Sequence, residues 1–201
     1  MNNGQHSLRP SSQQLEEALR RALRLQELRK RILRIFSPLI AVALLITLIL
    51  TLWLHILRVQ GGSSAPTLRD GEVIVFVTTG SLSYGDIIAF RHDGLVLIRR
   101  VIAVSGDRVD IDGDGVVMLN GEPLDEPYIN IRNAGEISID LPCRVPDNQF
   151  FVIGDNRLAS FDSRSSEIGM VNRGDIIGKA LIRILPLRKL ALLNDRYTTD
   201  K

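Results

Sequence analysis

A single long apolar run, residues 36–57, constrains the fold of this chain more than any other feature. It contains no Asp, Glu, Lys or Arg, and about 20 such residues suffice for a helix to cross the hydrocarbon core of a bilayer. Trp53 and His55 lie near its far end, where a membrane interface would be. We therefore predict one transmembrane helix over residues 36–57.

Basic residues are concentrated before this run. Residues 1–34 hold eight of them (Arg9, Arg20, Arg21, Arg24, Arg29, Lys30, Arg31 and Arg34) against the three acids Glu16, Glu17 and Glu27. Cytoplasmic flanks of membrane helices carry an excess of Lys and Arg. We expect residues 1–35 to be a cytoplasmic basic tail, and residues 58–201 to form an extracytoplasmic domain.

Leucines within the basic tail repeat at a helical spacing. They recur every three to four residues from Leu15 to Leu28, with arginines between them, and Ser12 can cap the start of such a helix. The pattern predicts an amphipathic helix. It fits a solvated helix and a helix lying on an anionic leaflet equally well.

Composition excludes several classes of protein. Aromatic residues make up 5% of the chain and the basic excess lies before the apolar run, which argues against a nucleic-acid-binding domain. Cys143 is the sole cysteine, so neither an intrachain disulfide nor a thiolate zinc site can form. There is no metal or nucleotide motif, and we expect no metal and no cofactor.

After Leu68 the apolar pattern changes from helical to alternating. Turn residues such as His92-Asp93-Gly94 separate the apolar segments, and Asp-Gly suits a tight hairpin. Short strands with such turns indicate an all-β domain of antiparallel sheets. Strands are predicted over residues 72–77, 85–90, 95–104, 116–119, 150–153 and 176–184.

The segment between the apolar run and the first strand reads Gly61-Gly62-Ser63-Ser64-Ala65-Pro66. Glycines allow backbone shapes closed to other residues, and proline fixes the chain and restricts the residue before it. Ser63 could therefore be presented rigidly, as a nucleophile needs to be. A plain linker between helix and domain has the same composition.

Four stretches, taken in order, resemble bacterial signal peptidase I, the membrane-anchored serine protease that removes signal peptides from exported proteins. The fourth is Gly-Asp-Asn-Arg followed by a Ser-x-Asp-Ser-Arg pattern. The stretches are residues 63–68, 84–90, 97–107 and 154–164. The resemblance implies a mainly β, antiparallel catalytic domain of signal peptidase type, preceded by the amphipathic and transmembrane helices.

The resemblance also implies residue roles. Ser63 would be the nucleophile, with its backbone N–H as an oxyanion donor, and Ser160 would orient the base. Asp155 and Arg164 would form an ion pair that holds the fourth stretch, with Asp162 in support.

The family binds its substrate peptide as an added strand. By resemblance, Gly61, Gly62, Val96 and Ile98 would contact it in this chain. Some members supply a second oxyanion donor from a serine at the position of Gly61, so here that donor would be backbone or absent.

One departure affects the chemistry. Arg99 occupies the position of the family's general-base lysine. A lysine pKa of about 10.4 can be lowered to about 7 by burial, whereas neutral arginine near pH 7 would cost about 8 kcal/mol. Arg99 therefore cannot accept the Ser63 proton. Lys179 could replace the base, and His92 fits better as a surface turn residue.

The sequence thus leads to two functional hypotheses. The first is a signal peptidase I that cleaves exported preproteins at the outer face of the bacterial cytoplasmic membrane, with signal peptides and membrane lipid as partners. The second is a catalytically impaired relative that binds precursors or assists assembly without hydrolysis, which Arg99 favours.

Overall fold

The structure is a computed structural model that describes residues 12–78 and 80–193. The chain divides into two compact units between residues 50 and 51. Residues 1–11, the first part of the predicted cytoplasmic basic tail, lie outside the described residues.

A long helix, α1, covers Ser12–Trp53. Within the part of the chain that the structure describes, it holds one stretch long and apolar enough to cross a membrane, Gln26–Trp53. The predicted amphipathic and transmembrane helices are thus one continuous helix. Pro38 lies inside this helix.

The predicted end of the membrane helix at residue 57 is wrong. The helix ends at Trp53, and Leu54–Arg58 form strand β1. This strand pairs antiparallel with β2, Val73–Val77, in a register that places His55 opposite Phe76. Apolar residues suit a membrane helix and a sheet strand alike, so pairing with β2 decides the boundary.

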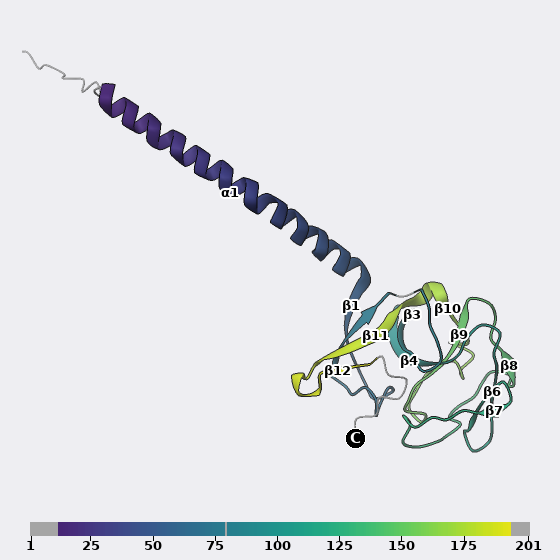
Figure 1. The fold of residues 1–201 in the computed structure, drawn as a ribbon. Coiled ribbons are helices and arrows are strands. Elements are labelled where there is room, and N and C mark those ends of the chain that lie inside the picture. The colour runs from purple at the N-terminus through teal and green to yellow at the C-terminus, as the bar shows by residue number, and fades with distance from the viewer. Residues whose placement is uncertain (1–11, 79, 194–201) are drawn as a thin grey trace, which may run out of the picture. The chain divides into compact units, whose positions relative to one another are not determined.

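The larger sheet has eight strands in the order β1-β2-β11-β3-β4-β9-β10, with β12 paired to β11 (Figure 1). All of its pairings are antiparallel. Its further strands are β3 Ile87–His92, β4 Leu95–Ala103, β9 Gln149–Ile153, β10 Val171–Asn172, β11 Ile176–Leu185 and β12 Ala191–Leu192. The mainly β, antiparallel fold that the sequence predicts is confirmed.

A smaller four-stranded sheet has the order β7-β6-β5-β8. Its strands are β5 Arg108–Ile111, β6 Val117–Leu119, β7 Glu122–Pro123 and β8 Cys143–Arg144. Two single-turn 3-10 helices, Arg173–Asp175 and Leu187–Lys189, flank β11.

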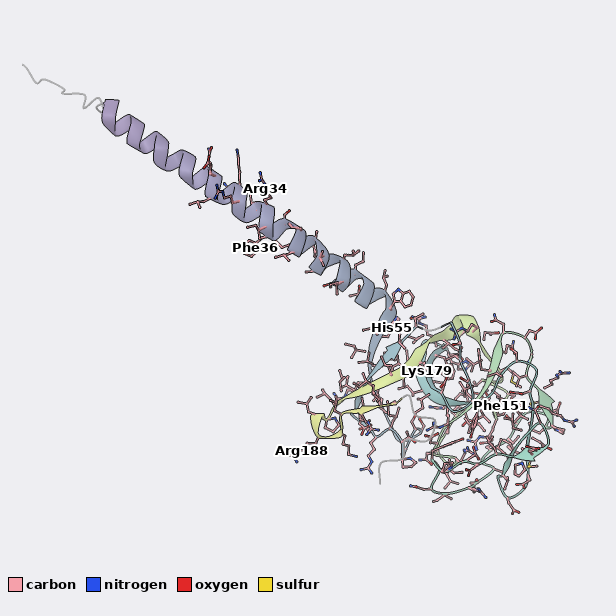
Figure 2. All side chains as sticks on the ribbon, viewed as in Figure 1. Arg34, Phe36, His55, Phe151, Lys179 and Arg188 are labelled. Atoms are coloured by element: carbon pink, nitrogen blue, oxygen red, sulfur yellow. The ribbon has the colours of Figure 1, made fainter. Side chains whose placement is uncertain are left out.

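The core consists of side chains that alternate along these strands. One face of β4 packs with Phe151, labelled inside the β domain in Figure 2, and with Val109 of the small sheet. The opposite face packs with Ile88 and Phe150. Between β3 and β4, Asp93 and Gly94 take positive φ angles of 47° and 77°, as the predicted hairpin requires. This hairpin fixes the register of β4 and therefore the position of Arg99.

Candidate active site

The Ser63 hydroxyl lies against the Arg99 guanidinium. Ser63 is in the turn that follows β1, where Gly61 has a φ of 80°, and Arg99 is on β4. Arg99 donates a hydrogen bond from Nη1 to the Ser63 Oγ over 2.9 Å. The structure therefore brings together the two residues on which the predicted chemistry depends.

Neutral oxygens surround the Arg99 side chain. Its Nε and Nη2 donate to the Phe161 carbonyl oxygen over 3.0 and 2.8 Å, and Nη1 also donates to the Ile98 carbonyl oxygen over 2.6 Å. Burial lowers the pKa of Arg99 from its ordinary value, against the opposing charge of Asp162. From the ordinary arginine pKa, neutrality near pH 7 would require about 8 kcal/mol, and the opposing charge of Asp162 favours the charged form, so the guanidinium stays charged and serves as a donor.

Asn156 holds the segment that carries Ser63. Its backbone N–H donates to the Ser63 carbonyl oxygen over 3.1 Å, and its side-chain Nδ2 donates to the Gly62 carbonyl oxygen over 3.0 Å. On the other side, the buried Ser64 hydroxyl donates to the Ile98 carbonyl oxygen over 3.0 Å. Sequence reasoning assigned no role to Asn156, although its place in the Gly-Asp-Asn-Arg stretch was the available signal.

Ser160 lies behind Ser63, against Gly154. A Cβ at Gly154 would overlap the Ser160 side chain and would lie 2.7 Å from the Ser63 carbonyl oxygen, so only glycine fits. The Ser160 Oγ is buried, and its interaction with the Asp162 carboxylate helps to lower the pKa of Asp162. None of the hydrogen bonds of Arg99 goes to Ser160, so the orienting role implied by the resemblance stays a prediction.

The predicted ion pair between Asp155 and Arg164 is wrong. Asp155 accepts hydrogen bonds from Arg100 over 2.9 and 2.6 Å and from the Thr67 hydroxyl over 2.5 Å. Arg164 instead pairs with Asp162 over two bonds of 2.8 Å each.

The register explains this exchange of partners. Arg100 lies opposite Ile153 in the β4–β9 ladder, and Asp155 follows Ile153 by two residues. Asp162 and Arg164 are two residues apart in one turn, so their pairing is local. Burial opposes the charged form of Asp162, but the hydrogen bonds and charge of Arg164 outweigh it and lower the pKa of Asp162.

A groove leads to Ser63 and Arg99. Its walls are the segment of residues 56–60 and the first half of β4, residues 95–99, with Ser63 and Ser64 between them. Val96 and Ile98 line it as predicted, whereas Gly61 and Gly62 do not. β1 is an edge strand, and β4 pairs with β9 only from Arg100 onward, so both walls present strand edges that can pair with an added strand.

The alternative base candidates are engaged elsewhere. Lys179 is on β11 (Figure 2), and its Nζ lies 2.7 Å from Asp86 Oδ1. His92 packs edge-on against the Phe161 ring, with 6.4 Å between the ring centroids, and its Nε2 lies 3.7 Å from Asp93. His92 is half-buried, and the Phe161 residue that it packs against supplies the carbonyl oxygen that Arg99 binds.

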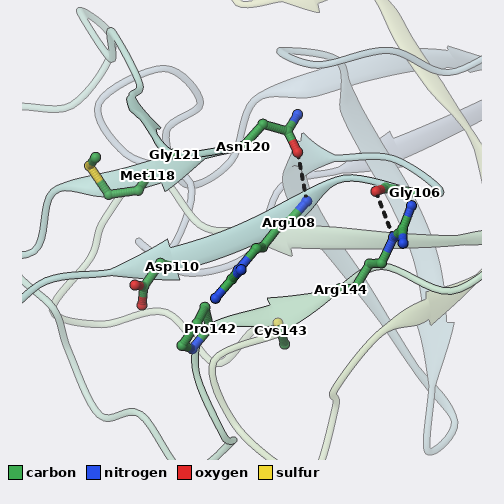
Figure 3. Close-up of a pocket in the computed structure, with 9 residues that line it drawn as sticks. All are labelled: Gly106, Arg108, Asp110, Met118, Asn120, Gly121, Pro142, Cys143 and Arg144. Carbon is green, nitrogen blue, oxygen red and sulfur yellow. Dashed lines mark hydrogen bonds between the residues drawn. The ribbon is translucent and has the colours of Figure 1, made fainter.

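A second groove lies on the outer face of the small sheet. Figure 3 shows Arg108 and Arg144 on neighbouring strands there, with Arg144 Nε donating to the Gly106 carbonyl oxygen over 3.0 Å. None of the sequence-predicted catalytic residues lines it. No group of His, Cys, Asp and Glu that could hold a metal ion occurs in residues 12–78 and 80–193.

The family model of signal peptidase, peptidase S26, matches residues 30–185. The chain belongs to this family. Signal peptidase I S of Bacillus subtilis is 34% identical over 148 residues, which cover 68% of this chain and 79% of that protein. Signal peptidase I U of the same organism is 32% identical over 168 residues, covering 78% of this chain and 88% of that protein.

A solved structure with a similar sequence is also a signal peptidase I. The crystal structure of the Enterococcus faecalis protein has 26% sequence identity and a TM-score of 0.43. The match covers 51% of this chain and 98% of the Enterococcus faecalis chain.

Proposed function

We propose that this protein is a signal peptidase I, a serine endopeptidase that removes signal peptides from exported preproteins. Family membership over residues 30–185 supports this function. The observation that carries it is the Ser63 hydroxyl at the end of a groove walled by two strand edges. A serine hydroxyl presented to an extended peptide is the arrangement that peptide-bond cleavage needs.

The substrate would lie in the groove as an added strand. Main-chain hydrogen bonds to residues 56–60 and 95–98 would hold it, and side-chain pockets would select its residues. The Ser63 backbone N–H has no acceptor within the described residues and can donate to an oxyanion. Gly61 offers no second donor of this kind, because its N–H binds Asp70 Oδ1 over 2.8 Å.

The protein would act at the outer face of the bacterial cytoplasmic membrane. The basic excess of residues 1–34 supports a cytoplasmic N-terminus, and Gln26–Trp53 is a candidate span. Exposed apolar side chains beside the groove, such as Leu95 and Ile56, support contact with membrane lipid.

A second candidate function rests on Arg99. A charged guanidinium that donates to Ser63 Oγ cannot remove its proton, so a precursor could bind without being hydrolysed. The comparisons favour the peptidase over this alternative, because the curated relatives described above are named signal peptidase I.

Cleavage of a preprotein by the full-length protein in lipid vesicles tests the proposal. Because Arg99 cannot act as a general base, we expect slow processing at one site, measured by mass spectrometry of the products, and its loss in Ser63→Ala. Ser83→Ala, which changes a serine outside the groove, is the matched control and should cleave normally. Unchanged processing by Ser63→Ala would overturn the proposed nucleophile, and binding of the preprotein without processing by the wild type would favour the second candidate.

A further inference from the structure

Arg99 differs from the other buried arginines by its lack of a carboxylate partner. Arg99, Arg100, Arg157, Arg164 and Arg183 are each at most 5% exposed. In the described part of the chain, the last four form ion pairs, with Asp155, Glu126, Asp162 and Glu72 respectively. Arg99 forms no ion pair there; its hydrogen-bond partners are two carbonyl oxygens and a hydroxyl.

An unpaired buried charge is unfavourable, and buried charges in proteins are normally paired. Arg99 lines the groove beside Ser63, so a bound peptide can reach its guanidinium. One of the two Nη2 hydrogens also lacks an acceptor within the described residues, because Nη2 makes one bond, to Phe161. An anion that enters the groove would supply the carboxylate partner that Arg99 lacks.

The position of Ser63 fixes where on the peptide this anion would be. The Ser63 Oγ attacks the carbonyl carbon of the scissile bond, so that carbon lies next to Oγ, and Arg99 Nη1 is 2.9 Å from the same oxygen. Hydrolysis converts this peptide carbonyl to an α-carboxylate and frees the amine of the following residue. An uncleaved peptide is neutral at this position, whereas the cleaved N-terminal product carries a negative charge.

We propose that Arg99 binds the C-terminal α-carboxylate of a peptide lying in the groove, which makes the site selective for the released signal peptide over the intact precursor. Hydrogen bonds between arginine and a carboxylate are shorter and about twice as strong as neutral ones. The product therefore competes with new substrate. This inference rests on the proposed function in one respect, that the groove binds the signal peptide.

The test compares two peptides of one sequence, a signal-peptide fragment ending in a free carboxylate and the same fragment ending in a carboxamide. Binding to the full-length protein in lipid nanodiscs is measured by fluorescence anisotropy. We expect the free acid to bind at least tenfold more tightly. In Arg99→Gln the ratio of the two affinities should fall to about one, while the matched control Arg91→Gln, an exposed change on β3, should keep it.

The outcomes separate the two claims. Equal binding of both peptides to the wild type would overturn the carboxylate site and leave the peptide groove intact. No binding of either peptide would contradict the proposed function together with this inference. A preference for the acid that survives in Arg99→Gln would also overturn the assignment to Arg99. The comparison of the acid and the amide uses only wild-type protein. It therefore tests the inference even if Arg99→Gln does not fold.

Discussion

Replacing Arg99 with lysine should increase cleavage. The structure places Arg99 in a buried position with neutral hydrogen-bond partners, next to the Ser63 hydroxyl. The charges of Asp162 and Asp155 favour the charged form at this position, but both carboxylates are paired with other arginines, so a lysine there would have no ion-pair partner within the described residues. Burial of this kind lowers a lysine pKa by up to about 3–5 units, from about 10.4 to near 7.

The expected gain follows from the neutral fraction of the base. With an unperturbed pKa of about 12.5, on the order of one arginine in 10⁵ to 10⁶ is neutral at pH 7, whereas about half of such lysines would be. A positioned general base contributes about 10²–10⁴-fold to the rate. We therefore expect Arg99→Lys to raise kcat/KM by about 10²–10⁴-fold, which corresponds to about 3–5 kcal/mol.

The assay is preprotein cleavage in vesicles by wild type, Arg99→Lys, and two controls. Arg91→Lys makes the same chemical change at an exposed site on β3 and should leave the rate unchanged. The double variant Ser63→Ala with Arg99→Lys should be inactive. In Arg99→Lys the rate should rise with pH through the lysine pKa. A folded Arg99→Lys protein that cleaves no faster than wild type would refute the reasoning.

Two further predictions concern the support of the site. Asp162→Asn should lower the free energy of unfolding by about 3–5 kcal/mol, measured by urea denaturation, because it leaves the buried Arg164 charge unpaired. The folded state lowers the pKa of Asp162, so the ionised carboxylate contributes to the free energy of unfolding. This contribution should be full above the unfolded pKa of about 3.9 and should be lost as pH falls through the folded pKa. The pH dependence should disappear in Asp162→Asn. Gly154→Ala should displace the Ser63 carbonyl and reduce cleavage strongly, while Gly174→Ala, where a Cβ meets open space, should not; equal effects of the two changes would contradict the close packing.

The sequence predicts the β domain well because its strands alternate and its turns contain Asp-Gly and Asn-Gly pairs. It fails at Leu54–Arg58, because an apolar strand and the end of a membrane helix have the same composition. Only the pairing of this segment with β2, far from any local signal, separates the two.

The site shows the same limit. The contact between Ser63 and Arg99 could be expected from the family resemblance, and the structure places them together. The ion-pair partners of Asp155 and Arg164 could not be predicted, because the four stretches contain several acids and arginines that could pair with them. The register of β4 against β9 assigns Arg100 to Asp155, and that register is a long-range property of the sheet.

The most direct test of the central claim is the charge state of Arg99 itself. The claim is that a permanently charged guanidinium, hydrogen-bonded to the nucleophile, occupies the position of the general base. Nitrogen-15 NMR of the Arg99 guanidinium, assigned by comparison with Arg99→Lys, reports its protonation between about pH 5 and pH 10. We predict a protonated signal across this range that shifts in Ser63→Ala. A signal that titrates near pH 7 would contradict the claim.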